Sequence, residues 1–479
     1  MVHQYKNNGY NIILDVNSGM VHVVDDLAYD IIAMYENNSQ GNIVSTMVEK
    51  YTQPQYMSLI ASKESKKEDF TENMESLVRQ ILEVMQDVEQ LKQDGSLFTK
   101  DIYEDYIKEF KQRSTVVKAL CLHIAHDCNL ACRYCFAEEG EYKGHRELMS
   151  YEVGKQALDF LIANSGSRRN LEVDFFGGEP LMNFQVVKDL VKYGREQEVI
   201  HNKNFRFTLT TNGVLLDDEV MEFANKEMSN VVLSIDGRKE INDKMRPSRN
   251  GKGSYDLILP KFQKLAESRS QTNYYVRGTF THNNLDFSED VKHLADLGFQ
   301  QISVEPVVAL PEDSYAITED DLPILFAEYD KLAKFMLERK QQGKDFNFFH
   351  FMIDMTGGPC VAKRLSGCGS GTEYLAVTPW GDLYPCHQFV GIPEFVMGNV
   401  FDGINTPDLR EEFKMCNVYS KEKCTNCFAK FYCSGGCAAN SFKFHENIND
   451  AYDIGCELQK KRVECAIMIK AATEEDNTN

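Results

Sequence analysis

The chain has 479 residues, of which 43% are hydrophobic, and its formal net charge is −21 at pH 7. This length predicts two to four domains with ordinary buried cores. The excess of acidic residues argues against nucleic-acid binding, because phosphates require a basic surface, and it suits a basic peptide partner. No run of eighteen apolar residues and no signal-peptide pattern at Met1 is present, so the sequence predicts a soluble, cytoplasmic protein without a membrane partner.

Residues 1–95 predict a small separate domain. The apolar runs Tyr10–Val16 and Met20–Val24 are joined by a short Asn-Ser-Gly segment, which is typical of a hairpin, and three amphipathic helices follow. This is a winged-helix pattern, which serves either DNA binding or peptide capture at a free strand edge. The segment holds fifteen acidic residues against seven Lys and Arg, which argues against DNA. A domain that only supports the fold is the remaining alternative.

A loop with three thiols follows a polar linker, residues 96–115, and a strand at Val116–Ile124. The thiols have C-x3-C-x2-C spacing and belong to Cys128, Cys132 and Cys135. A 4Fe–4S cluster takes four ligands and prefers thiolate, so three thiols in one loop leave one iron open. Zinc sites usually close all four positions from the protein. The loop therefore predicts a cluster with an open iron.

Five further strands alternate with helices up to residue 310, which predicts parallel β/α units. Three of these strands end in conspicuous turns, Gly177–Pro180 (GGEP), Thr211–Gly213 and Asp236-Gly237. Ligands of parallel barrels bind where the strands end, so we expect these turns to surround the cysteine loop. Residues 311–355 predict a bridging region with a long helix, Leu322–Gln341, and an aromatic turn.

The C-terminal region, residues 356–479, is rich in cysteine. Fourteen cysteines in an intracellular chain favour metal sites over disulfides. Seven of them have the spacing C-x12-G-x4-C, then C-x2-C-x5-C-x3-C, then a last cysteine after eighteen residues: Cys368, Cys386, Cys424, Cys427, Cys433, Cys437 and Cys456. This set predicts iron–sulfur or zinc sites. Cys121, Cys360, Cys416 and Cys465 fall outside the pattern.

Together, the cysteine loop, the GGEP turn and the ends of the next two strands resemble the radical S-adenosylmethionine (SAM) superfamily. The resemblance implies an α/β fold, a partial (β/α)6 barrel over residues 116–310, and a catalytic cluster on Cys128, Cys132 and Cys135 that binds SAM at its open iron. Tyr134 would lie against the adenine, and Gly178 and Glu179 at the amino group. Further contacts would come from the ribose or carboxylate residue Ser234 and the carboxylate-binding Arg246, with Arg277 as a second candidate. Asn212 and Asp236 are weaker candidates.

The seven C-terminal cysteines resemble the SPASM extension of radical SAM enzymes, which implies two auxiliary 4Fe–4S clusters and three clusters in all. By this resemblance the distal cluster is held by Cys424, Cys427, Cys433 and Cys456, and the proximal cluster by Cys368, Cys386 and Cys437. The proximal set lacks a fourth thiolate, which either Cys360 or a cysteine of the substrate supplies. We favour the substrate, because an open iron would bind and activate its thiol.

The combined pattern resembles the thioether-forming, sactipeptide-type maturases of the cysteine-rich SCIFF peptides. This resemblance implies that residues 1–95 recognise the leader of a ribosomally made precursor. A radical derived from SAM would remove the α-hydrogen of an acceptor, by resemblance a threonine, and a cysteine sulfur would bond to that carbon. It also implies anaerobic chemistry and an electron donor such as flavodoxin or ferredoxin.

Two alternatives remain. A sulfatase-type maturase, which makes formylglycine, or another SPASM peptide-crosslinking enzyme would share the barrel and the clusters. Sulfatase maturases carry Asp after the second cysteine of the G-x4-C element, where this chain has His387, and this difference counts against them. A noncatalytic iron–sulfur or zinc peptide-binding protein belongs to another class, and it has no use for the GGEP turn or for the Ser234 and Arg246 spacing.

Overall fold

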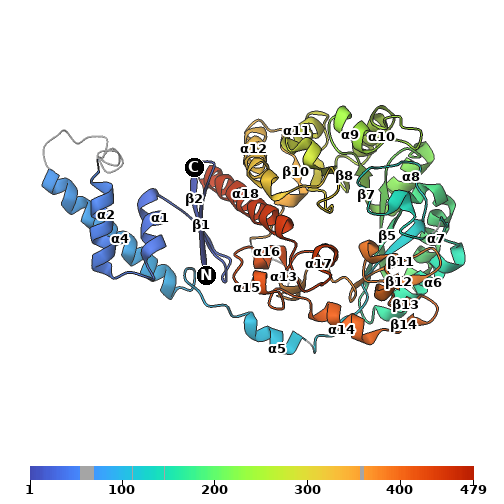
Figure 1. Ribbon diagram of the computed structural model, residues 1–479, viewed down its shortest axis with the longest axis horizontal. Helices are drawn as coiled ribbons and strands as arrows, with labels where there is room; N and C mark the ends of the chain where they lie inside the picture. Colours follow the sequence, from blue (N-terminus) through green and yellow to red (C-terminus); the bar gives the residue numbers. More distant parts are fainter. Residues whose placement is uncertain (54–69, 111, 145, 356–360, 479) are drawn as a thin grey trace. The chain divides into compact units, whose positions relative to one another are not determined.

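The computed structural model describes residues 1–53, 70–110, 112–144, 146–355 and 361–478 (Figure 1). The chain forms two compact units. The first is built mainly from Met1–Glu104 and Glu464–Asn479, and the second from Asp105–Asp354 and Gly358–Val463. The first unit therefore includes the end of the chain, which the sequence analysis assigned to the cysteine-rich domain. Within the described residues, no helix is long and apolar enough to cross a membrane.

The first unit begins with an antiparallel sheet of order β1-β2-β3, followed by three helices. The elements are β1 (Val2–Asn7), β2 (Tyr10–Asp15), β3 (Val21–Val24), α1 (Asp26–Met34), α2 (Gln40–Tyr51) and α4 (Phe70–Gln93). Strand β1 was not predicted from the sequence. Asn8 and Gly9 join it to β2, both at positive φ (47° and 89°), and an Asn-Gly pair in this conformation is a strong hairpin signal.

The three helices of this unit bury a shared apolar stripe, with residues spaced three or four apart on each helix. The stripe comprises Leu27, Ile31, Ile43, Met47, Tyr51, Leu77, Ile81 and Met85. Asp25 caps α1 by accepting the N–H of Ala28 at 2.8 Å. The end of α18 (Asp453–Thr478) contacts β1 of the same unit, where the Tyr5 hydroxyl donates to the Glu464 carbonyl at 2.9 Å.

The second unit contains a sheet of eleven strands in the order β10-β9-β8-β7-β6-β5-β4-β11-β12-β13-β14, in which the edge strand β10 is Asn347–Phe348. Its parallel centre confirms the predicted β/α units. These strands are β4 (Ala119–Ala125), β5 (Asn170–Gly177), β6 (Asn204–Thr211), β7 (Met228–Ser234), β8 (Tyr274–Phe280) and β9 (Gln301–Pro306). The intervening helices are α6 (Tyr151–Asn164), α7 (Phe184–His201), α8 (Asp218–Glu227), α9 (Lys239–Met245), α10 (Tyr255–Ser268) and α11 (Phe287–Asp296).

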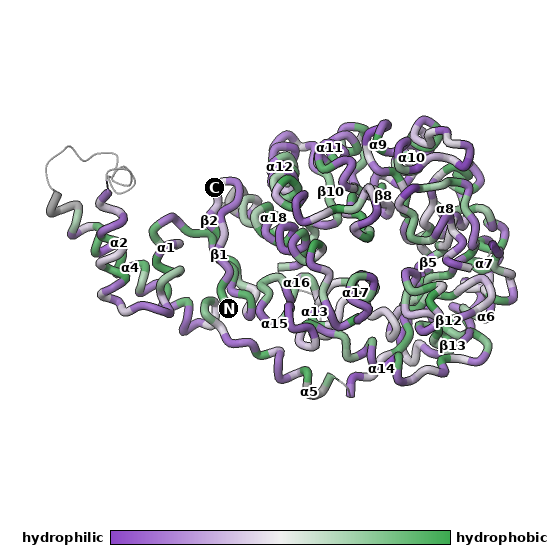
Figure 2. The backbone as a smooth tube through the Cα atoms, viewed as in Figure 1, coloured by the Kyte–Doolittle hydropathy of each residue, from purple (hydrophilic) through white to green (hydrophobic). Residues whose placement is uncertain are grey.

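Alternate residues of the central strands are buried, as expected for a sheet with one face against helices. Leu171, Val173 and Phe175 of β5 are fully buried, whereas the alternate residues Asp174 and Phe176 are partly exposed on the other face. The predicted helix Leu322–Gln341 is present with the same bounds as α12. Its hydropathy changes repeatedly between apolar and polar along its length, as does that of α18 (Figure 2). In the sheet, burial of the apolar side chains that face the helices leaves the other face free to carry polar side chains.

The cysteine-rich segment extends the barrel sheet directly. Strand β11 (Tyr374–Val377) pairs in parallel with β4, with Tyr374 opposite Ala119. Strands β12 (Asp382–Tyr384), β13 (Gly398–Asn399) and β14 (Gly403–Ile404) follow in antiparallel pairing. Short helices complete the segment: α13 (Val361–Ser366), α14 (Pro407–Met415), α15 (Glu422–Thr425), α16 (Lys430–Cys433) and α17 (Ala438–His445). Cys386 lies two residues after β12, so these pairings place it near the part of the sheet that contains β4.

Candidate functional site

The cysteine loop follows β4 and is held by the chain segment that follows α9. The Ala131 N–H donates to the Pro247 carbonyl at 2.8 Å, and the Arg133 N–H donates to the Met245 carbonyl at 2.9 Å. All three thiols are free and partly exposed. Burial raises the pKa of Cys128 to about 12 and that of Cys132 to about 11. A thiolate here therefore needs a positive partner, which a cluster iron would supply.

Donors already face two of these sulfurs. The Leu130 N–H and the Asn212 side-chain amide each lie 3.5 Å from the Cys128 sulfur, and the Arg246 guanidinium lies 4.0 Å from that of Cys132. Hydrogen bonds and nearby cations stabilise thiolates that ligate an iron–sulfur cluster. This set of three thiols with supporting donors fits such a cluster.

The GGEP turn packs tightly against the backbone that leads into the cysteine loop. The Gly178 N–H donates to the Ala125 carbonyl at 2.7 Å, and the Glu179 N–H donates to the Asp127 carbonyl at 2.8 Å. A Cβ on Gly178 would lie 2.1 Å from the Asp127 carbonyl oxygen, a distance that real Cβ atoms do not reach. Glycine is therefore required for this close approach.

Glu179 links the ends of β5 and β6. Its buried carboxylate accepts hydrogen bonds from the Asn212 N–H (2.8 Å), the Thr211 hydroxyl (2.8 Å) and the Leu181 N–H (3.0 Å). Burial raises the pKa of Glu179 to about 7, and these three donors act in the opposite direction. The carboxylate thus fixes two strand ends beside the cysteine loop, and Asn212 belongs to the same network.

Asp236 is the centre of a second buried network. Its carboxylate accepts from the Tyr134 hydroxyl at 2.7 and 2.8 Å, from the Arg246 Nε at 2.9 Å and from the Thr279 N–H at 3.0 Å. The Arg246 guanidinium carbon lies 5.5 Å from the centroid of the Tyr134 ring. Two predicted SAM contacts, Tyr134 and Arg246, are thus brought together, and both are hydrogen-bonded to Asp236, one of the two weaker candidates.

The remaining two predicted SAM contacts are neighbours on adjacent strands. Ser234 ends β7 and lies opposite Arg277 of β8 in the sheet register. The Arg277 guanidinium forms an ion pair with Glu305 of β9. Both charged side chains remain partly exposed, so they are accessible to a ligand at this end of the barrel.

The distal set of cysteines forms one electrostatic group. Burial first, and the neighbouring thiols second, raise the pKa of Cys424, Cys433 and Cys456 to about 11, and Cys427 acts on all three. Among the described residues, no three His, Cys, Asp or Glu side chains are gathered closely enough to hold a single metal ion. The distal thiols therefore influence one another electrostatically, although they lie farther apart than ligands of a single metal ion.

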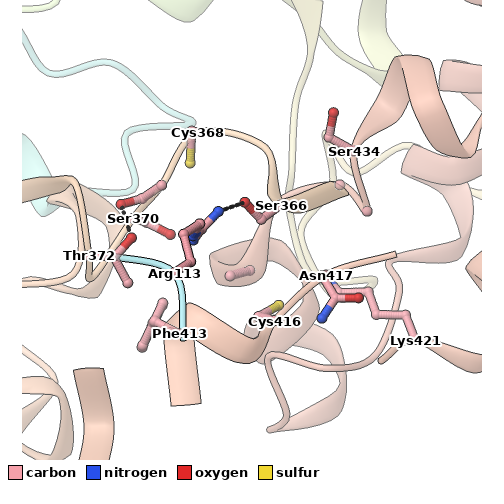
Figure 3. Close-up of a pocket in the computed structure, with 14 residues that line it drawn as sticks. Arg113, Ser366, Cys368, Ser370, Thr372, Phe413, Cys416, Asn417, Lys421 and Ser434 are labelled. Atoms are coloured by element: carbon pink, nitrogen blue, oxygen red, sulfur yellow. Dashed lines mark hydrogen bonds between the residues drawn. The ribbon is translucent and has the colours of Figure 1, made fainter. Parts of the chain in front are cut away.

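The three proximal cysteines also influence one another electrostatically. Burial raises the pKa of Cys386 and Cys437, and each of these thiols also responds to Cys368. Cys360, the candidate fourth ligand, lies outside the described residues. Cys416, which fell outside the spacing pattern, lines a pocket together with Cys368, Arg113 and Lys421 (Figure 3). Cys121 is a buried core residue of β4.

The pairing of β11 with β4 brings Cys386, of the proximal set, next to the cysteine loop, where Cys135 packs against the same apolar cluster. His387 follows Cys386, and its ring lies 5.5 Å from that of Phe136, the residue after Cys135, and 5.2 Å from that of Phe176 on β5. Burial, and secondarily Arg277, lower the pKa of His387 to about 4. The imidazole is therefore neutral near pH 7.

Residues 116–259 match a family model described as a 4Fe–4S single cluster domain. The chain is 32% identical over 315 residues to the uncharacterised protein MJ0907 of Methanocaldococcus jannaschii, covering 66% of this chain and 96% of that protein. It is 24% identical over 354 residues to the cysteine-type anaerobic sulfatase-maturating enzyme of Clostridium novyi, covering 70% and 91% of the two chains.

Two solved structures share the fold. The anSMEcpe structure with bound AdoMet and the Cp18Cys peptide gives a TM-score of 0.61 at 20% identity and covers 76% of this chain and 99% of that one. Streptococcus suis SuiB bound to the precursor peptide SuiA gives 0.50 at 17% identity and covers 95% and 100%. The fold, the cysteine loop and these matches define a radical SAM enzyme with a 4Fe–4S cluster domain. The chain belongs to the radical SAM maturase family that includes the anaerobic sulfatase-maturating enzymes.

Proposed function

We propose that this enzyme forms an intramolecular thioether between a cysteine sulfur and the α-carbon of an acceptor residue, threonine by resemblance, in a ribosomally made cysteine-rich precursor peptide. The observation that carries the proposal is the pairing of β11 with β4. Through this pairing, Cys386 and His387 approach the loop that carries Cys135 and Phe136. A site that holds a substrate thiol would then adjoin the source of the radical.

The chain's own residues would position the peptide and exclude water. When bound, SAM and the loop cluster supply a radical that removes a hydrogen atom from carbon. The rings of Phe136 and Phe176 contact that of His387 and would shield its imidazole from water on those sides. The neutral His387 imidazole can accept a hydrogen bond from a cysteine thiol and so orient its sulfur. Arg277 and Glu305 lie at the same end of the barrel, where their charged side chains would form hydrogen bonds with the peptide backbone.

The auxiliary sites would serve the substrate thiol and the electron that the reaction releases. The three proximal cysteines, Cys368, Cys386 and Cys437, leave one position for the substrate cysteine, and a thiol bound to iron loses its proton readily. The four distal cysteines would hold a closed cluster. Three clusters correspond to about twelve irons per chain.

The N-terminal unit would bind the leader of the precursor. Among the strands that the structure describes, β3 is at the edge of its sheet and pairs with β2 alone, so its other side can accept an extended peptide. The acidic composition of residues 1–95 favours a basic leader. An excess of the isolated leader should therefore inhibit modification of the full precursor. It should not slow the SAM cleavage that the enzyme catalyses when the precursor is absent. Undiminished modification would leave this unit with only a supporting role.

The reaction is tested by anaerobic reconstitution with dithionite, SAM and a cysteine-rich precursor encoded beside the enzyme. We expect 5′-deoxyadenosine and a peptide that loses two hydrogens and one alkylatable thiol for each bond. Formylglycine made from serine also costs two hydrogens, but it preserves every thiol and creates an aldehyde that hydrazide reagents capture. The relation to sulfatase-maturating enzymes makes this the second candidate. A noncatalytic peptide-binding protein would produce no 5′-deoxyadenosine.

A further inference from the structure

Lys421 is a buried cation without a carboxylate partner among the described residues. Its side chain is 2% exposed, and its Nζ donates to the Ser441 hydroxyl at 3.2 Å. Removing an ammonium group from water costs several kcal/mol unless negative charge compensates it. One neutral hydroxyl does not provide that charge, so a negative group should accompany Lys421 in the working enzyme.

The lysine connects the two sets of auxiliary cysteines. Its carbonyl accepts the N–H of Cys424, the first cysteine of the distal set, at 2.9 Å. Its Nζ partner, Ser441, lies one turn after Cys437 of the proximal set, and the Ser441 hydroxyl in turn donates to the Cys437 carbonyl at 3.0 Å. The Lys421 side chain therefore spans from the start of one set to the helix that begins after the other.

One cysteine of each set is connected to Lys421 by hydrogen bonds, Cys424 directly through its N–H and Cys437 through the Ser441 hydroxyl. The lysine also lines the pocket that contains Cys368 and Cys416 (Figure 3). The Asp450 carboxylate also lies within range of this charge, but it is 38% exposed and screened by water, so ligand thiolates on either side would supply the buried negative charge.

We propose that Lys421 is the shared counter-cation of the two auxiliary clusters and raises the reduction potential of both. This inference rests on the auxiliary-cluster part of the proposed function. When a substrate thiolate and an α-carbon radical form one C–S bond, one electron is left over, and its transfer to an auxiliary cluster adds one negative charge beside the lysine. A buried positive charge stabilises that reduced state.

The test compares Lys421→Met with wild type by redox titration of the reconstituted enzyme, monitored by electron paramagnetic resonance. We expect the midpoint potentials of both auxiliary clusters to shift to more negative values, while that of the SAM-binding cluster stays unchanged. The matched control is Lys423→Met. Lys423 is 51% exposed and paired with Asp453, so water screens its charge and its loss should have much less effect.

Unchanged potentials in Lys421→Met at full iron content, or an equal shift in Lys423→Met, would overturn the inference while leaving the proposed function intact. If Lys421→Met instead loses iron, Lys421→Arg should restore both the iron and the potentials, since it keeps the charge. Failure of Lys421→Arg to restore them would also overturn it. Wild-type protein with iron for one cluster only would refute the auxiliary-cluster assignment and this inference together.

Discussion

A methyl group added at Gly178 should disconnect the GGEP turn from the cysteine loop. In Gly178→Ala the Cβ would lie 2.1 Å from the Asp127 carbonyl oxygen and 2.6 Å from its carbon, so the turn must move by roughly 1 Å to reach ordinary contact distance. That movement breaks the hydrogen bonds from Gly178 to Ala125 and from Glu179 to Asp127. Overpacking of this kind costs about 1–3 kcal/mol, and each bond adds about 1 kcal/mol.

The control for this substitution is Gly298→Ala in the same unit. Gly298 has φ +93° and no atom within 4 Å of its added Cβ, so it carries only the conformational cost of about 1–2 kcal/mol. We expect thermal unfolding, followed by circular dichroism under anaerobic conditions, to occur at a lower temperature in Gly178→Ala than in the control. We also expect 5′-deoxyadenosine formation to fall in Gly178→Ala alone. Equal unfolding temperatures with full SAM cleavage would refute the steric argument.

Three further predictions concern the site. Cys132→Ala should abolish SAM cleavage and keep about eight of about twelve irons, and any remaining 5′-deoxyadenosine would refute the catalytic assignment. Asp236→Ala leaves the buried Arg246 cation unpaired and should lower the free energy of unfolding, measured in urea, by about 3–5 kcal/mol. The control Asp218→Ala removes an exposed ion pair with Lys264 and should lower it by only about 0–1 kcal/mol. Equal costs would contradict the buried pair. Burial raises the folded-state pKa of Glu179 from 4.5 to about 7, so the folded state binds its proton more tightly than the unfolded state. The contribution to the free energy of unfolding is present below pH 4.5 and is lost as the pH rises through 7, about 3 kcal/mol in all. In Glu179→Gln the free energy of unfolding should therefore depend less steeply on pH over this range. An unchanged pH dependence would contradict the raised pKa.

Local sequence signals predicted the elements whose patterns are continuous along the chain. The six alternating strands expected between residues 116 and 310 are present, and α12 has its expected bounds, because each combines a clear hydrophobic period with turn residues at its ends. Strand β1 was missed although the Asn8-Gly9 pair marks its turn. Of its six residues, VHQYKN, Val2 and Tyr5 alone carry large hydrophobic side chains, and they do not alternate with polar residues, which weakens the hydrophobic signal.

Pairings between distant segments could not be predicted in the same way. The addition of β11 to the barrel beside β4 depends on which sheet edge is free, a property that no local pattern encodes. Similarly, Tyr134 and Asp236 are 102 residues apart, and their hydrogen bond exists only because β4 and β7, with β5 and β6 between them, end at the same edge of one parallel sheet. Lys421 had no signal at all, since a lysine between cysteines is ordinarily exposed.

The central claim, that the radical removes a hydrogen from an α-carbon to form a thioether, is tested most directly by isotope transfer. A precursor with deuterium at the α-carbon of its candidate threonine acceptors is incubated with the reconstituted enzyme, dithionite and SAM, and the 5′-deoxyadenosine is examined by mass spectrometry. We expect one deuterium in the 5′-deoxyadenosine for each thiol lost from the peptide. Unlabelled 5′-deoxyadenosine from this precursor, together with deuterium transfer from a peptide labelled at the β-carbon of serine or cysteine and an aldehyde product, would contradict the claim and establish formylglycine chemistry instead.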